Sequence, residues 1–147
     1  MSEDVEGAAL RRKIEADNEA LTRRFNAAWS DKDVEGIVSC VADDVVYMVH
    51  EGGRMLHGKE EVRATLTNFM KLWKKIEFQI LGLHVMGPLV IHERTEYYTG
   101  VEGQPDWSFW VAALLIIKDG KIVIWRDYSM PGKKQISSPI PRADHQG

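Results

Sequence analysis

Apolar residues recur at three- and four-residue steps near the start of the chain, with charged residues between them. The members of this series are Leu10, Ile14, Leu21, Phe25 and Trp29. The spacing predicts a helix over Ala8–Trp29, and we expect the highly charged first part, residues 1–15, to fray. Asp33 is a suitable cap for a short second helix that reaches Cys40. A further apolar series predicts a third helix over Lys59–Trp73.

The period changes from helical to alternating after the third helix. Alternation predicts strands over Val45–His50, Phe78–Met86, Leu89–Tyr98, Trp107–Ile117 and Ile122–Met130. The dipeptides Gly87-Pro88 and Asp119-Gly120 favour tight turns between strands, and Gly52-Gly53 predicts a loop. The segment 131–147 contains Ser, Pro and Gly, so we expect a loosely ordered tail there.

The order of elements indicates the fold class. Helices come first and a run of antiparallel strands follows, which is typical of a single α+β domain over residues 1–147. The early helices are the elements available to cover one face of the sheet. A strongly curved mixed or antiparallel sheet that is closed by N-terminal helices forms a cone. The sequence therefore predicts a cone around an apolar pocket.

Charged residues recur on one face of the expected strand Leu89–Tyr98. Because successive strand residues point to opposite faces, the residues that share this face are His92, Arg94, Glu96 and Tyr98. The corresponding set in the last strand is Trp125, Asp127 and Ser129. A guanidinium presents five donors in a planar fork, so Arg94 can bridge Glu96 and Asp127. One acid can then stay ionised as a base while the other stays protonated as an acid.

A structural ion-pair network is the alternative interpretation of the same three residues. A buried arginine between two carboxylates often only holds strands together, and strand spacing does not show which face is wet. We interpret His84 and His92 as ordinary strand residues and Cys40 as a buried helix residue. The His and Cys residues lack the spacing of a zinc site, so we expect neither a metal nor a cofactor.

Three short segments carry a resemblance to a known family. They are Glu93-Arg94-Thr95-Glu96, Asp119-Gly120-Lys121-Ile122 and Trp125-Arg126-Asp127-Tyr128. Together they resemble the limonene-1,2-epoxide hydrolase family, which belongs to the nuclear-transport-factor-2-like (NTF2-like) or SnoaL-like group of cone folds. The resemblance runs from about Phe25 to Met130, and its Trp-Arg-Asp-Tyr motif is the most specific part.

The resemblance implies a one-step opening of an epoxide by water, with no covalent enzyme intermediate. It implies that Asp127 is the base for the attacking water and that Glu96 is the acid for the epoxide oxygen. Arg94 would bridge the two acids, and Tyr47 would help hold the water. General acid–base help of this kind typically contributes about 10²–10⁴-fold per group. The implied substrate is a small apolar molecule, terpene-like or cyclic.

Two positions depart from the family's pattern. Val49 stands where the family has an asparagine that also holds the water, and a valine side chain neither donates nor accepts. His50 is expected to face the other way, and His57 is a looser substitute. Glu96 stands where the family usually has aspartate. Val49 favours two alternatives: a cone-fold isomerase or dehydratase with Asp127 as proton abstractor, or a non-catalytic small-molecule-binding protein.

The candidate substrate-binding residues are mostly apolar or aromatic. They are Val49, Phe69, Trp73, Tyr98, Phe109, Val111, Trp125 and Ser129. The long strand Trp107–Ile117 is apolar on both faces, with Trp107, Phe109, Val111 and Ala113 on one and Ser108, Trp110, Ala112 and Leu114 on the other. One face should line the pocket, and the other should pack on helices or a second subunit. We therefore expect a homodimer.

Composition and charge narrow the range of partners. The chain has 147 residues, of which 44% are hydrophobic and 28% are charged, and its net charge is −3. This balance is typical of a globular domain and gives no basic surface for nucleic acid. No apolar run approaches the roughly 20 residues that cross a bilayer. One cysteine and an acidic N-terminus without a secretion-signal pattern lead us to expect a cytoplasmic protein with no membrane partner.

Overall fold

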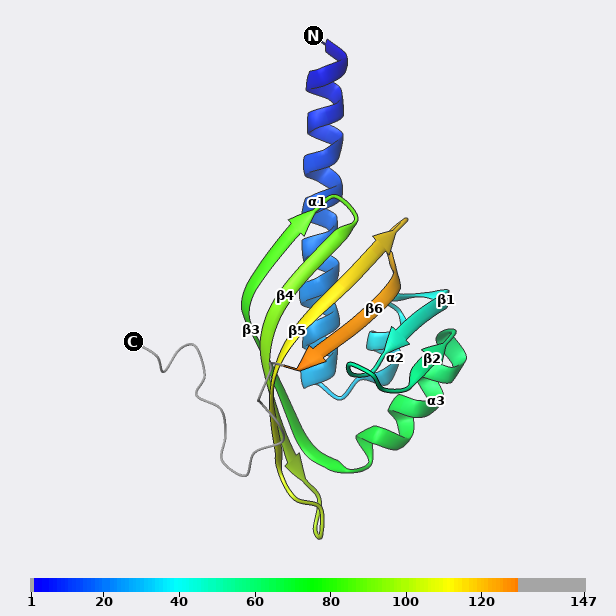
Figure 1. Cartoon of the computed structure of the whole chain (residues 1–147), viewed down its shortest axis with the longest axis vertical. Coiled ribbons are helices and arrows are strands. Elements are labelled where there is room, and N and C mark those ends of the chain that lie inside the picture. The colour runs from blue at the N-terminus through cyan, green and yellow to red at the C-terminus, as the bar shows by residue number, and fades with distance from the viewer. Residues whose placement is uncertain (1, 130–147) are drawn as a thin grey trace, which may run out of the picture.

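The computed structural model describes residues 2–129, with the helices in the first half of the chain and most of the strands in the second (Figure 1). The helices are α1 (Ser2–Ser30), α2 (Val34–Val38) and α3 (Lys59–Met70). The strands are β1 (Val41–Met48), β2 (Met55–His57), β3 (Trp73–Met86), β4 (Leu89–Gly100), β5 (Trp107–Lys118) and β6 (Lys121–Ser129). The predicted tail and Met130, the expected end of the last strand, lie outside the described residues.

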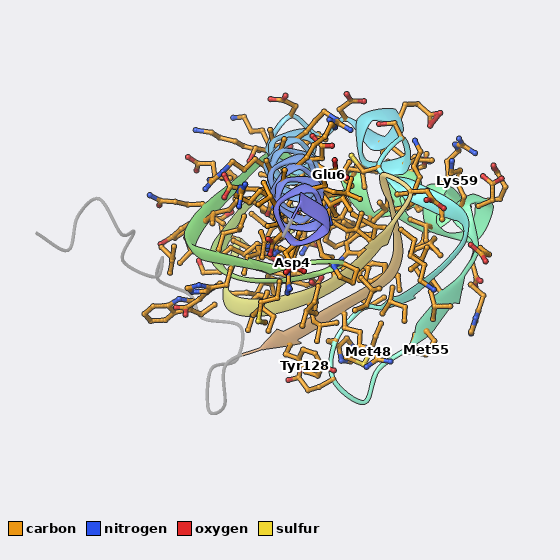
Figure 2. The ribbon with its side chains drawn as sticks, turned by 90° about the horizontal axis from the view of Figure 1, so that it is seen from above. Asp4, Glu6, Met48, Met55, Lys59 and Tyr128 are labelled. Atoms are coloured by element: carbon orange, nitrogen blue, oxygen red, sulfur yellow. The ribbon has the colours of Figure 1, made fainter. Side chains whose placement is uncertain are left out.

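Within the described residues, the strands form one six-stranded sheet in the order β2-β1-β6-β5-β4-β3. The strands from β3 to β6 are antiparallel neighbours, and β1 and β2 are also antiparallel. β1 and β6 run parallel, so the sheet is mixed rather than a simple antiparallel run. The sheet curves around α1 (Figure 1), and the view along that helix shows the strands passing beneath it, with side chains filling the space between (Figure 2). The predicted α+β cone is confirmed.

The second half of α1 packs on the concave face of the sheet. Its apolar face buries Leu21, Phe25 and Trp29, each worth roughly 1.5–3 kcal/mol relative to an exposed side chain. The helix begins at Ser2, six residues before the predicted start at Ala8, and its first turns extend beyond the sheet (Figure 1). That these turns fray stays a prediction. None of the helices in the described part is long and apolar enough to span a membrane.

Two sequence-based boundaries near the third helix were wrong. α3 ends at Met70, and Trp73 is the first residue of β3, where it pairs with Gly100 of β4. An aromatic residue suits a strand, and pairing along the sheet edge outweighs the helical spacing of the apolar residues. The interpretation of residues 52–58 as a loop also missed β2, a three-residue strand that pairs with β1.

The first strand and second helix also differ from the prediction. β1 begins at Val41, four residues early, because Val41 pairs with Ile122 of β6. The register then shifts between Val41 and Val46, so the two aspartates that were expected to precede the strand lie within it and are exposed. The predicted cap of α2 is confirmed: Asp33 Oδ1 accepts from the Gly36 amide at 2.9 Å. α2 ends at Val38, however, so Cys40 lies in the turn after the helix and was wrongly predicted as a helix residue.

Candidate active site

Arg94 on β4 holds an acidic residue on each side of its guanidinium. Its Nε donates to Glu96 Oε2 at 2.7 Å, and its Nη2 lies 2.5 Å from the same oxygen. Nη2 also lies 3.1 Å from Asp127 Oδ1 on β6. The structure therefore brings together the three charged side chains that the strand pattern selected. Their exposed fractions are 2%, 6% and 8% for Arg94, Glu96 and Asp127.

The register of the sheet explains how a side chain of β4 reaches one of β6. β5 lies between them, where Arg94 pairs with Val111 and Asp127 pairs with Ala113. Neighbouring strands are about 4.8 Å apart, so the guanidinium has to cross about 10 Å. The extended arginine and the Asp127 side chain span that distance together, and the small side chain of Ala113 does not block their path.

Asp127 accepts hydrogen bonds from three different side chains. Besides Arg94, Trp125 Nε1 donates to Oδ1 at 3.1 Å, and the Tyr47 hydroxyl donates to Oδ2 at 3.0 Å. The Tyr47 ring stacks on Trp125, with ring centroids 3.4 Å apart and an interplanar angle of 7°. These two residues are paired in the parallel β1–β6 ladder, so the sheet places both donors at the same carboxylate.

Glu96 also lies among hydrogen-bond donors, and it has an aromatic ring beside it. The Tyr98 hydroxyl donates to its Oε1 at 2.7 Å, and Arg94 occupies Oε2. Phe78 pairs with Glu96 across the β3–β4 ladder, and its ring centroid lies 4.9 Å from the Arg94 Cζ. The apolar surroundings therefore cover both the acid and the cation that it contacts.

Burial sets the protonation of the groups around the two acids. It raises the pKa of Glu96 above its ordinary value, which Arg94 opposes and Asp127 reinforces. Burial also raises the pKa of Tyr47 and of Tyr98 well above the ordinary tyrosine value, so both hydroxyls keep their protons. Burial disfavours the Arg94 cation, but the adjacent Asp127 and Glu96 raise its pKa overall.

A cavity of about 280 Å³ opens above this cluster, and seven of its sixteen lining residues are aromatic. The lining residues are Trp29, Tyr47, Val49, His50, Glu51, Thr65, Leu66, Phe69, Phe78, Arg94, Glu96, Tyr98, Trp107, Phe109, Val111 and Asp127. We call Arg94, Glu96, Asp127 and Tyr47 the pocket floor, because they are buried. We call Val49, His50, Glu51 and Thr65 the pocket mouth, because they are exposed or half-buried.

Most of the predicted pocket residues line the cavity. The predicted substrate-binding residues that line it are Val49, Phe69, Tyr98, Phe109 and Val111. Two others do not, because they form a layer behind the wall: Trp73 packs against Tyr98, and Trp125 packs against Tyr47. The Ser129 side chain lies outside what the structure describes.

Several lining residues were missed by the candidate list. They are Trp29, His50, Glu51, Thr65, Leu66, Phe78 and Trp107. Trp107 belonged to the β5 set whose orientation the sequence left open, and the structure turns that set inward. Phe78 pairs with Glu96 and Trp107 pairs with Tyr98, so strand register is the signal that identifies both. Alternation within one strand does not contain that information.

Val49, where the family resemblance leads us to expect an asparagine, lies in the lining of the cavity. Val49 lines the pocket with an aliphatic side chain. His50 lines it as well, contrary to the expectation from alternation, because β1 ends at Met48 and the period of two stops there. His57 lies on β2 and is not among the residues that line the cavity.

The family follows from a direct comparison. A family model described as a SnoaL-like domain matches residues 22–125, and the chain belongs to this family. The epoxide hydrolase EphG of Mycobacterium tuberculosis is 30% identical over 104 residues, which cover 71% of this chain and 67% of EphG. The predicted resemblance to limonene-epoxide-hydrolase-like proteins is therefore confirmed.

Solved structures show the same fold. An LEH-like epoxide hydrolase from M. tuberculosis superposes with a TM-score of 0.71 at 24% identity, covering 80% of this chain and 86% of the other. A protein of Catenulispora acidiphila with a ketosteroid-isomerase-like fold superposes with a TM-score of 0.66 at 18% identity, covering 74% and 83%. The fold is thus shared by proteins named for different chemistries, and the side chains of the pocket have to distinguish between them.

The cavity provides organic acid and base groups rather than a metal-binding cluster. Within residues 2–129, no group of three or more His, Cys, Asp or Glu side chains is arranged to hold a metal ion. The buried Cys40 has its Sγ 3.5 Å from the Gly36 carbonyl oxygen and does not line the pocket. The ionisable side chains at the pocket floor are those of Arg94, Glu96, Asp127 and Tyr47.

Proposed function

We propose that the protein is an epoxide hydrolase that adds water to the epoxide of a small apolar substrate in one step. The observation that supports this most is a single guanidinium between two buried carboxylates in different environments. Asp127 accepts hydrogen bonds from Arg94, Trp125 and Tyr47, which hold its carboxylate at the floor of the cavity. Glu96 has a pKa raised by burial, which favours the protonated form. A base and an acid thus face one cavity.

Both groups act in a single transition state. The water oxygen bonds to one epoxide carbon as the bond from that carbon to the epoxide oxygen breaks. Asp127 takes a proton from the water, and Glu96 gives its proton to the departing oxygen, so the product is a diol. Exchange with solvent then returns a proton to Glu96 and removes one from Asp127.

The other floor residues position these two acids. Arg94 keeps the carboxyl groups close together and partly offsets their repulsion. The Tyr47 hydroxyl donates to Asp127, and its oxygen can accept a hydrogen bond from the same water. With Val49 in place of asparagine, Tyr47 and Asp127 are the groups that hold the water in this chain.

The cavity favours a small and apolar substrate. Its volume of about 280 Å³ is just below the roughly 300–1,000 Å³ that is typical of ligand pockets. The rings of Trp29, Phe69, Phe78, Trp107 and Phe109 form part of this wall. A cyclic or terpene-like epoxide fits this wall, with its oxygen directed toward Glu96.

Val49 favours one alternative, a cone-fold isomerase or dehydratase. Such an enzyme needs a base but no positioned water, so the loss of a side chain that holds the water would not lower its rate. Asp127 would remove a proton next to a carbonyl, and Glu96 would donate to the carbonyl oxygen. Exchange of deuterium from solvent into a ketone or enone, measured by NMR, would identify this reaction.

Diol formation from a panel of epoxides tests the proposal. The panel includes limonene oxide, cyclohexene oxide and styrene oxide, and chiral gas chromatography measures the diol. We expect turnover of at least one member, and Asp127→Asn and Glu96→Gln each to lower kcat by about 10²–10⁴-fold. No diol above the uncatalysed rate from any member would contradict the proposal.

Two matched variants control for the amide substitutions. Asp119→Asn makes the same change in the exposed β5–β6 turn, and Glu93→Gln makes it on β4 outside the pocket lining. Both are expected to keep the rate of the wild type. If either control lost as much activity as the floor variants, the assignment of Asp127 as the base and Glu96 as the acid would be contradicted.

A further inference from the structure

His92 is a buried residue of β4 that does not line the cavity. Its exposed fraction is 1%, and it lies two residues before Arg94 on the same face of the strand. Its Nε2 is 3.1 Å from Arg94 Nη1 and 3.4 Å from Nδ2 of Asn26 on α1. The imidazole therefore lies behind the guanidinium, on the side away from the two carboxylates.

The chemistry of this contact is fixed by the arginine. A guanidinium has donors only, so His92 Nε2 has to be the acceptor and the ring proton has to be on Nδ1. Burial and the adjacent Arg94 lower the pKa of His92 to about 3, which keeps the ring neutral across the physiological range. Asn26 Nδ2 also donates to the Thr22 carbonyl at 2.9 Å, which fixes its amide orientation.

Each of the three guanidinium nitrogens of Arg94 thus has a partner. Nε contacts Glu96, Nη2 contacts both acids and Nη1 contacts His92. Without an acceptor at Nη1, the guanidinium could rotate about its Cδ–Nε bond or move, and the contacts with Glu96 and Asp127 would change together. The other ionisable groups in this cluster are Tyr47 and Tyr98, and each donates to one of the acids instead.

We propose that His92, supported by Asn26, is a positioning residue that sets the orientation of Arg94 and thereby the protonation of Glu96. The effect of His92 on the rate rests on the proposed function. Its effect on the protonation of Glu96 does not, because that protonation is a property of the free protein. The second half of α1 is part of this device: Asn18, Thr22 and Asn26 form a buried polar row that ends at His92.

A carboxyl titration tests this without any substrate. Protein labelled with ¹³C at the glutamate carboxyl is titrated by NMR, and the Glu96 signal is identified by its loss in Glu96→Gln. Arg94 lowers the pKa of Glu96, so weaker contact should raise it. We expect His92→Leu to raise the pKa of Glu96 by about one pH unit. His92→Gln retains an acceptor and is expected to leave it close to that of the wild type.

Two further variants separate positioning from a general loss of packing. His92→Asn stays polar but withdraws the acceptor from Arg94, and it is expected to raise the pKa of Glu96 as His92→Leu does. If His92→Leu does not fold, His92→Asn tests the inference in its place. Thr95→Val changes a fully buried polar residue on the opposite face of β4 and is expected to leave the pKa of Glu96 unchanged.

Kinetics supply the second measurement if an epoxide is turned over. His92→Leu is expected to lower kcat by about 10–100-fold with KM within about threefold, because it changes no residue of the pocket lining. His92→Gln should keep most of the wild-type kcat.

An unchanged pKa of Glu96 in folded His92→Leu or His92→Asn would overturn the inference. Equal shifts of this pKa in His92→Leu and His92→Gln would overturn it as well. Absence of epoxide turnover in the wild type would reject the proposed function and leave this titration valid.

Discussion

The pocket floor and the pocket mouth are built in different ways. At the floor, Arg94, Glu96, Asp127 and Tyr47 come from three strands of one sheet, and hydrogen bonds of 2.5–3.1 Å join them. At the mouth, Val49, His50 and Glu51 follow the end of β1, and Thr65 lies on α3. The register of the sheet therefore fixes the acid and the base, whereas a loop and a helix shape the entrance. Loops tolerate changes that a buried network does not.

The largest effect should follow removal of the cation at the floor. Arg94→Leu leaves two buried carboxylates without their common partner, and breaking such a pair typically costs about 3–5 kcal/mol of folding free energy. Chemical denaturation should show this loss, together with a loss of turnover. Arg63→Leu removes a half-buried surface arginine that pairs with Glu35 and Glu60, and little change is expected. Similar losses in the two variants would contradict the special role of the floor.

The pH dependence of the rate should report the protonation of Glu96. Because burial raises the pKa of this acid, its proton is retained above the ordinary glutamate range and is lost as the pH rises further. The rate should therefore fall about tenfold per pH unit above the pKa of Glu96. Tyr98→Phe removes a donor that lowers this pKa, so the fall should move to higher pH. A fall that moves to lower pH in Tyr98→Phe would contradict the assignment.

Tyr47→Phe tests the other acid of the floor. The substitution removes the donor to Asp127 Oδ2 and one of the groups that hold the water, while the ring can still stack on Trp125. We expect a loss of about 10–100-fold in kcat with little change in folding stability. A rate equal to that of the wild type would show that Tyr47 only packs against the sheet.

A substitution at the pocket mouth is expected to raise kcat rather than lower it. Val49→Asn adds a side chain that can donate to and accept from a water in the cavity, so kcat for an accepted epoxide should rise by about 3–10-fold. A fall in kcat would indicate that Val49 contacts the substrate instead. Activity that is absent in the wild type and present only in the variant would favour a binding protein.

Association through the outer face of β5 is expected to have the smallest effect on the chemistry. Trp110, Ala112 and Leu114 are half-buried on the face opposite the cavity, and the homodimer stays a prediction. Light scattering should give twice the mass of one chain, and Leu114→Glu should reduce it to one chain while leaving the pocket intact. A single-chain mass in the wild type would contradict the dimer.

The floor could be predicted from the sequence, whereas much of the mouth could not. Arg94 and Glu96 are two residues apart on one strand, and alternation alone puts them on one face. Asp127 and Tyr47 needed the family resemblance for their roles, although the structure places them in the same cluster. His50 was misplaced because alternation ends with β1, and Trp73 was assigned to a helix because strand pairing is not visible in local spacing. The contact between His92 and Arg94 depends on side-chain directions that a strand pattern does not give.

Direct attack by water is the central claim, and a single-turnover experiment in H₂¹⁸O tests it. The protein is held in excess over an accepted epoxide, and mass spectrometry measures the label in the diol and in the protein. We predict one ¹⁸O atom in the diol formed in the first turnover and an unlabelled Asp127 and Glu96. An unlabelled diol with ¹⁸O in one of these carboxylates would show a covalent intermediate and contradict the account.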